Sequence, residues 1–547
     1  MTAPSTTLRV GEGLLAGVAS ADGRVRAFKG IPYARPPVGA RRWQPPQPPL
    51  RWDGVRPAAS FGARCPQFPV RANSLYAGGH ESQSEDCLSL NVWTAAETID
   101  ERRPVMVWFH LGAFQFGGAS VPLYDGEQLA RAGVVVVTVN HRLGRLGFLA
   151  HPELSAESAH QASGNYGIHD LIQALRWLAE NVAAFGGDPD RVTIFGLSAG
   201  SMSVSMLMAS PLARGLFHRA IGHSGASLGP VGASCGITDS MQDLPHAEQT
   251  GLALAKSLSV RTVEELRRLP AEALMLAPVP TGDDRWTLDA VDAPFSRGGL
   301  DSSFPIVDGH LLPQSAFAIF RDGRQAPVPL ITGSVAGEGS GMPYMADAAR
   351  FVADSRAEYG EDAAAFLALY PATDDEQARV SSAAANGDRV FVWQNWTWAR
   401  LHGGRNGPPT YYYHFSHAPP LPSDAVVAEQ SLGAFHGAEI PYVFRHLAAR
   451  DWPWTPYDHE LSEVISGYWT RPPRAIRTAR VPSRGRASAP RRRWRCTSAT
   501  RCAAGRSRAP GTSRSGTPTT RVAARRRDQP ARAKETGWLG DWPGRWF

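Results

Sequence analysis

The sequence predicts an α/β fold in which a mostly parallel central sheet is flanked by helices and preceded by antiparallel strands. Continuous apolar runs at residues 105–109 and 134–140 are typical of parallel strands that are covered on both faces. An amphipathic pattern that begins near residue 164 indicates a helix. A strand, a sharp turn and a second helix follow within residues 191–204, and this succession is the unit from which parallel α/β sheets are built.

The N-terminal part predicts strands of a different kind. Residues 7–34 alternate between apolar and polar side chains and contain turn signals at 11–13 and 22–23, so we expect antiparallel strands there. Further along, Cys65 and Cys87 bracket a polar segment. The two cysteines permit a disulfide, and two reduced thiols are the alternative.

Small residues directly follow the apolar run at 105–109. Gly112 and Ala113 lie within His-Leu-Gly-Ala at residues 110–113. Small residues after a central strand let backbone N–H groups face a ligand, so these two residues are candidate donors to an oxyanion. A merely flexible turn is the alternative.

The strongest chemical signal is Gly-Leu-Ser-Ala-Gly at residues 196–200, between a β-branched and aromatic run and a helical pattern. A serine on so tight a turn is held in a strained conformation and exposed at the sheet edge, where Ser198 can act as a nucleophile. The motif alone is weak, but its flanks favour this interpretation. Such a serine also needs a base, an acid that orients the base, and an oxyanion hole.

Two later segments offer the acid and the base. Glu338 lies in a glycine-rich loop just after the apolar run at 328–332, at the sheet edge where α/β folds keep their sites. His436 follows 98 residues later, in a second glycine-containing segment. The order serine, acid, histidine along the chain is that of the α/β-hydrolases.

Seven segments together resemble the type-B carboxylesterase and cholinesterase family, and the resemblance covers about residues 7–470. They are Phe-Lys-Gly-Ile-Pro-Tyr-Ala at 28–34, Ser-Glu-Asp-Cys-Leu-Ser-Leu-Asn-Val at 84–92, Gly-Asn-Tyr-Gly at 164–167, Phe-Gly-Gly-Asp-Pro at 185–189, Gly-Leu-Ser-Ala-Gly at 196–200, Ser-Gly-Ala at 224–226 and Phe-His-Gly-Ala-Glu-Ile-Pro-Tyr at 435–442. The resemblance implies an α/β-hydrolase domain that hydrolyses carboxylic esters through an acyl-enzyme, without a cofactor or a metal.

The resemblance also implies the roles of individual residues. Ser198 is the nucleophile, His436 the general base and Glu338 the acid that orients it. The supporting roles are an oxyanion hole formed by the N–H groups of Gly112, Ala113 and Ala199, support of the acid by Ser224, and a disulfide between Cys65 and Cys87.

The sequence departs from the family pattern at several positions beside this site. Leu197 replaces a glutamate before the nucleophile, Leu111 replaces a glycine, and His223 replaces a glutamine. The family's Asn-x-Asp-Glu-Gly is Val-Ala-Gly-Glu-Gly at residues 335–339. These departures are compatible with a specialised pocket or with relaxed selection, so the alternative function is a catalytically weak or silent cholinesterase-like binding protein.

The positive net charge of +7 belongs to the end of the chain. Residues 471–547 contain 21 Arg and Lys against three acidic residues, a net +18, so residues 1–470 carry −11. An acidic body argues against a nucleic-acid partner. No apolar run is long enough to span a membrane, and the N-terminus has no signal pattern, which predicts a cytoplasmic enzyme with a small-molecule ester as its partner. The sequence predicts no oligomeric state.

Residues 471–547 differ abruptly from the catalytic domain at 1–470. They are rich in Arg, Pro, Ala, Gly, Ser and Thr without apolar periodicity, so we expect a disordered tail. An out-of-frame translation of GC-rich DNA explains both the composition and the abrupt change. One synonymous back-translation of residues 474–480, read two bases later, gives Arg-Asp-Pro-Asn-Gly-Pro, which resembles the family's continuation. Resequencing the gene tests this hypothesis.

Overall fold

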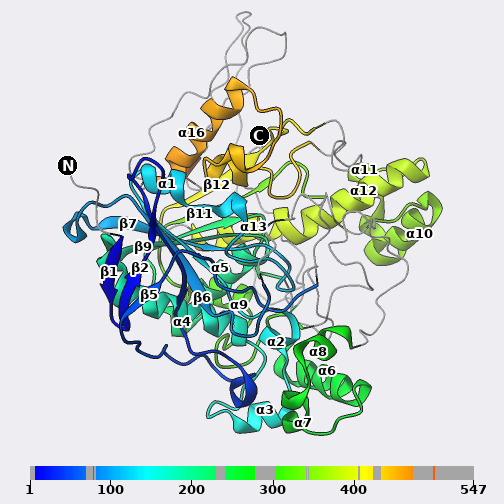
Figure 1. Ribbon diagram of the computed structural model, residues 1–547. Helices are drawn as coiled ribbons and strands as arrows, with labels where there is room; N and C mark the ends of the chain where they lie inside the picture. Colours follow the sequence, from blue (N-terminus) through cyan, green and yellow to red (C-terminus); the bar gives the residue numbers. More distant parts are fainter. Residues whose placement is uncertain are drawn as a thin grey trace, which may run out of the picture.

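A ten-stranded sheet runs through the body of the protein (Figure 1). The computed structural model describes residues 6–68, 78, 82–229, 241–277, 303–339, 342, 344–404, 407–422, 433–471 and 497–498. From one edge to the other, the strands of the sheet are β13 (Thr497–Ser498), β12 (Thr410–Phe415), β11 (Leu330–Val335), β10 (Arg219–His223), β9 (Gly187–Leu197), β7 (Arg103–Phe109), β8 (Val135–Val139), β6 (Ser89–Thr94), β4 (Arg26–Pro32) and β3 (Val18–Ala19).

The centre of this sheet is parallel and its two edges are antiparallel. All neighbours from β8 to β12 pair in parallel. At one edge, β3 pairs antiparallel with β4, β4 with β6 and β6 with β8, and at the other edge β13 pairs antiparallel with β12. A separate small sheet contains β1 (Thr7–Val10), β2 (Gly13–Ala16) and β5 (Val55–Pro57), with β1 and β2 antiparallel. The predicted fold class is therefore confirmed, including the antiparallel strands at residues 7–34.

Helices cover both faces of the sheet, which explains the continuous apolar runs. Along β7, Val105 and Val107 belong to one apolar cluster and Met106 and Trp108 to the other. One cluster includes α4 (Tyr166–Asn181) and α5 (Ala199–Ala209), and the other includes α1 (Glu127–Arg131), α15 (Ile440–Val443) and α16 (Pro456–Thr470). Figure 1 shows α4 and α5 on one side of the strands and α1 and α16 on the other.

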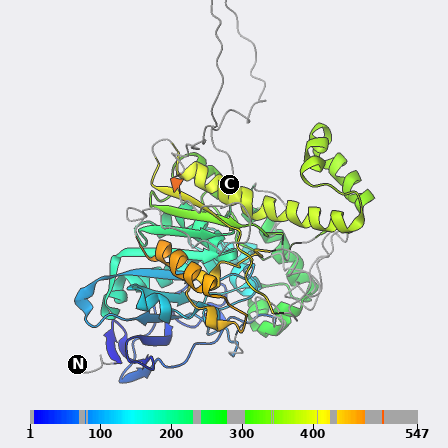
Figure 2. The ribbon, with the colours of Figure 1, turned by 90° about the horizontal axis from the view of Figure 1, so that it is seen from above.

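The remaining helices lie around this layered body. They are α2 (Gly144–Phe148), α3 (Pro152–Glu157), α6 (Leu244–Ser257), α7 (Val263–Arg268), α8 (Ala271–Leu276), α9 (Ala316–Arg321), α10 (Ala348–Tyr359), α11 (Ala363–Leu369), α12 (Asp375–Gly387) and α13 (Trp393–His402). The yellow-green helices α10 to α12 project from the body (Figure 2), and they carry a small apolar cluster of their own. A π-helical segment, Asp388–Val392, joins α12 to α13, which packs on β11.

The catalytic domain predicted at residues 1–470 ends with α16. Of the predicted disordered tail, the structure describes only Arg471 and β13, which pairs antiparallel with β12. The other tail residues lie outside the described part. No helix within the described ranges is both long and apolar enough to cross a membrane.

Candidate active site

Ser198 occupies the sharp turn between β9 and α5. Its backbone has φ 57° and ψ −120°, and its hydroxyl is not used to cap the helix that follows. The turn requires glycine: a Cβ on Gly200 would lie 2.0 Å from the Phe109 carbonyl oxygen of the neighbouring strand β7. As the motif predicts, the strand and the helix cross so closely that the serine is held in a strained, left-handed conformation and stays partly exposed.

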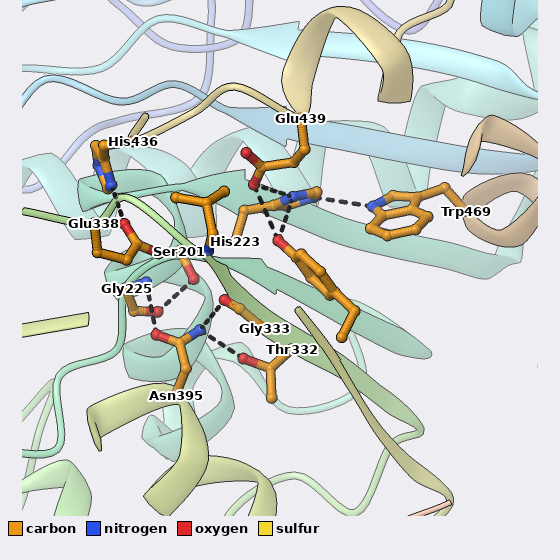
Figure 3. Close-up of polar contacts among 12 residues, drawn as sticks. Ser201, His223, Gly225, Thr332, Gly333, Glu338, Asn395, His436, Glu439 and Trp469 are labelled. Carbon is orange, nitrogen blue, oxygen red and sulfur yellow. Dashed lines mark hydrogen bonds and ion pairs between the residues drawn. The ribbon is translucent and has the colours of Figure 1, made fainter. Parts of the chain in front are cut away.

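His436 and Glu338 form a buried pair, and the residue after His436, Gly437, packs against Leu197, which directly precedes Ser198. The His436 Nδ1 atom lies 2.7 Å from Glu338 Oε2, and Glu338 is only 2 % exposed (Figure 3). The other carboxylate oxygen, Oε1, accepts a hydrogen bond of 2.9 Å from the Val335 N–H. The His436 ring also stacks on Phe391, with the ring centroids 4.2 Å apart. The carboxylate fixes the tautomer of the imidazole, and Phe391 fixes the plane of its ring.

Backbone pairing brings the acid and the histidine together despite their separation in sequence. The Gly337 N–H donates to the Ala434 carbonyl at 2.8 Å, and Gly337 forms a parallel bridge with Phe435. The loop after β11 therefore runs beside the segment that carries His436.

The candidate oxyanion donors lie on two neighbouring segments. Gly112 has φ 129° and Ala113 has φ 52°, in a tight turn after β7. A Cβ at residue 112 would lie 1.9 Å from the Phe116 carbonyl oxygen, so this turn requires glycine. Ala199 is the first residue of α5, and the N–H groups of a first helical turn have no partner within the helix. Since β7 and β9 are adjacent, the structure brings both segments to the same edge of the sheet.

Ser224 does not make the contact that the sequence predicts for it. Its hydroxyl is buried and forms no hydrogen bond within the described part of the chain, while its N–H donates to the Gly333 carbonyl at 2.9 Å. Glu338 uses both carboxylate oxygens elsewhere, one on the Val335 N–H and one on His436. A backbone N–H therefore supports the acid in place of the serine hydroxyl.

The expected disulfide is not formed, because Cys65 and Cys87 are both free and buried. The Cys65 sulfur accepts a hydrogen bond of 3.2 Å from the Leu143 N–H. The hydrogen bond to Cys65 raises the pKa of the Cys87 thiol well above its usual value, and burial raises it further. Because only a thiolate attacks a disulfide, the raised pKa lowers the reactivity of Cys87 in thiol–disulfide exchange.

Leu111 and Leu197, the two apolar departures from the family pattern, line one hollow beside His436. Leu197 packs closely on the residue after the histidine, since its Cδ2 atom lies 2.9 Å from where a Cβ on Gly437 would be. Most of the other side chains around the hollow are apolar, and the full lining is Leu111, Val121, Leu123, Tyr124, Leu197, Phe435, His436, Gly437, Ile440, Pro441, Arg450 and Trp452.

A second histidine anchors the candidate oxyanion turn. His110 Nδ1 lies 2.7 Å from the carbonyl oxygen of Leu111, and its ring stacks on His141 with centroids 4.7 Å apart. Burial lowers the pKa of His110 to about 4. His110 is therefore neutral near pH 7, and its Nδ1–H can donate to the turn without placing a charge beside the site.

Several residues near the site escape prediction from the sequence. Asn395 of α13 accepts a hydrogen bond from the Gly225 N–H at 2.7 Å and donates to Thr332 at 2.7 Å (Figure 3). Glu439 is buried and contacts His223. In the sequence, the only sign of a role for Glu439 is its position three residues after His436. Among the described residues, no group of three or more His, Cys, Asp or Glu side chains could hold a metal ion.

Residues 4–471 match the model of the Carboxylesterase family. The chain belongs to this family. The match ends within one residue of the composition change predicted at 470. The protein is thus a carboxylic ester hydrolase with the α/β-hydrolase fold.

Individual relatives agree with this assignment. The chain is 34 % identical over 452 residues to the fumonisin B1 esterase of Sphingopyxis macrogoltabida, covering 79 % of this chain and 74 % of that esterase. It is 35 % identical to the para-nitrobenzyl esterase of Bacillus subtilis (strain 168), covering 77 % of this chain and 80 % of the relative. A solved structure of a PNB esterase superposes with a TM-score of 0.66 at 33 % identity, over 86 % of this chain and 90 % of that one.

Proposed function

We propose that this carboxylesterase cleaves its ester through an acyl-enzyme on Ser198, with His436 as general base and Glu338 as orienting acid. The contact of 2.7 Å between His436 Nδ1 and Glu338 Oε2 is the observation that carries the proposal. It places the ring proton on Nδ1, so Nε2 has the lone pair that a general base needs. The tight turn that requires glycine at position 200 carries Ser198, whose hydroxyl is the nucleophile that such a base activates.

The reaction follows from these roles. The Ser198 Oγ attacks the ester carbonyl carbon while His436 Nε2 takes the hydroxyl proton, and the carbonyl oxygen becomes an oxyanion that accepts from the N–H groups of Gly112, Ala113 and Ala199. His436 then gives its proton to the leaving alkoxide, which departs as an alcohol. Water attacks the acyl-enzyme with the same histidine as base, and the acid is released while Ser198 regains its proton.

The leaving alcohol occupies the apolar hollow. His436 lines this hollow and delivers the proton to the leaving oxygen, so the alcohol lies on this side of the histidine. Leu197 and Leu111 make the wall apolar where the family pattern has a glutamate and a glycine. A wall that contains Arg450 and lacks that carboxylate favours a neutral apolar alcohol over a cationic one, because the guanidinium group repels a cation.

Turnover of p-nitrophenyl esters of increasing acyl length tests the catalytic proposal. Ser198→Ala should lower kcat at least about a thousandfold, because the triad acts as a unit. Ser205→Ala is the matched control. Ser205 is a buried serine of α5, the helix that follows Ser198, and its hydroxyl donates to the Met202 carbonyl. Near-normal turnover by Ser198→Ala would overturn the assignment and favour the binding-protein alternative.

A pair of substrates with one acyl group tests the alcohol preference. Butyl butyrate and butyrylcholine differ in whether the alcohol is neutral or cationic. We expect a higher kcat/KM for the neutral ester in the parent, and a smaller difference in Leu197→Glu. A preference for the cationic ester in the parent would contradict the proposed role of the hollow.

A further inference from the structure

A second buried histidine and glutamate pair lies to one side of His436 and Glu338 (Figure 3). His223 Nδ1 lies 3.3 Å from Glu439 Oε1, and the Tyr413 hydroxyl lies 3.0 Å from each of these two atoms. The Trp469 Nε1–H donates to His223 Nε2 at 3.0 Å. These four side chains are at most 8 % exposed, and they come from β10, the start of α15, β12 and α16.

The protonation of this cluster follows from its partners. An indole N–H can only donate, so His223 Nε2 must carry a lone pair and the ring proton sits on Nδ1. Burial raises the pKa of Tyr413 well above its usual value, as does the neighbouring Glu439, so the phenol keeps its proton and donates it to the carboxylate. His223 is thus neutral, and both of its ring nitrogens are hydrogen-bonded to buried partners. Neither nitrogen is available to transfer a proton to or from a substrate.

His223 is connected to both halves of the proposed triad. Its carbonyl oxygen accepts the Ser198 N–H at 2.9 Å, so its main chain holds the nucleophile's turn. Its side chain contacts Glu439, which lies three residues after His436 in the same short segment. In the register of β9 and β10, His223 is the partner of Leu197, so two departures from the family pattern are neighbours across adjacent strands.

We propose that His223 is a positioning residue that fixes the segment bearing His436 relative to Ser198, through hydrogen bonds to Glu439 and Trp469. This inference rests on the proposed triad. A shift of about 1 Å between such groups can cost about a hundredfold in rate. Glutamine, the family's residue at this position, has both a donor and an acceptor and could serve both partners, whereas leucine of similar size serves neither.

Three variants test the proposal by steady-state kinetics on a p-nitrophenyl ester. His223→Leu should lower kcat about 10- to 100-fold with KM within about twofold, since substrate contacts are untouched. His223→Gln should restore kcat to within about threefold of the parent. His402→Leu is the control: this histidine is 1 % exposed, lies at the C-terminal end of α13 and contacts the Val328 carbonyl oxygen at 2.7 Å. It should leave kcat per folded molecule unchanged.

A spectroscopic measurement separates positioning from mere stability. In ¹⁵N-histidine-labelled protein, the His223 Nε2 signal should be that of an unprotonated nitrogen, and Trp469→Phe should shift it. The proposal is overturned if His223→Leu keeps the parent kcat, if its loss matches that of His402→Leu, or if Nε2 carries a proton. Failure of the triad itself would show separately, as activity that survives in Ser198→Ala.

Discussion

Glu338→Gln tests how one carboxylate sets the chemistry of His436. The Val335 N–H points at one oxygen of residue 338 from 2.9 Å, so a glutamine keeps its amide oxygen there. Its NH₂ group then takes the place of Glu338 Oε2, which lies 2.7 Å from His436 Nδ1 in the parent. Two donors cannot face each other, so the imidazole proton moves from Nδ1 to Nε2. The ring can then no longer accept the proton of Ser198.

The expected loss in kcat is about 10⁴-fold, the size seen when a serine-protease triad is forced into the wrong tautomer. This corresponds to about 5.5 kcal/mol of activation free energy. Asp458→Asn is a matched control, because Asp458 is also buried and lies 2.7 Å from His417 Nε2. Thermal unfolding by circular dichroism should show both variants folded. A Glu338→Gln enzyme within about tenfold of the parent would refute the tautomer argument.

Four further outcomes follow from the structure. Leu111→Gly should raise kcat/KM for bulky esters relative to short ones, measured with p-nitrophenyl substrates, because the residue lines the hollow beside His436. Leu197→Glu should lower the urea-measured free energy of unfolding by roughly 3 kcal/mol, since it buries an unpaired carboxylate. Because the pKa of His110 is about 4 when folded, the unfolded chain takes up this proton first as pH falls. Between pH 6.5 and 4, the free energy of unfolding should therefore drop by up to about 3 kcal/mol more in the parent than in His110→Gln. Cys65 and Cys87 should both react with iodoacetamide after unfolding without reductant; a cross-linked peptide of the two would contradict their reduced state.

The elements that carry the site could be predicted because their signals are local. The turn at Ser198 is encoded by two glycines between a strand and a helix, and the crossing of the backbones there needs both. Glu338 and His436 could be found only by their order along the chain. Backbone pairing between residues 337 and 434–435 brings them together. Such pairing uses only main-chain groups, so the sequence gives no sign of it.

The contacts that escaped prediction are of two kinds. The acid is held by the Val335 N–H, and any residue could supply that group, so no side chain reveals it. Tyr413 and Trp469 look like ordinary core aromatics in a strand and a helix, and their polar atoms matter only because His223 and Glu439 lie opposite.

Labelling with a fluorophosphonate followed by peptide mass spectrometry tests the central claim most directly, because only an activated serine reacts with this probe. We predict one adduct per molecule, on the peptide that contains Ser198, and labelling that is strongly slowed in Glu338→Gln. An adduct on a different serine, or no adduct on folded parent protein, would contradict the proposed triad.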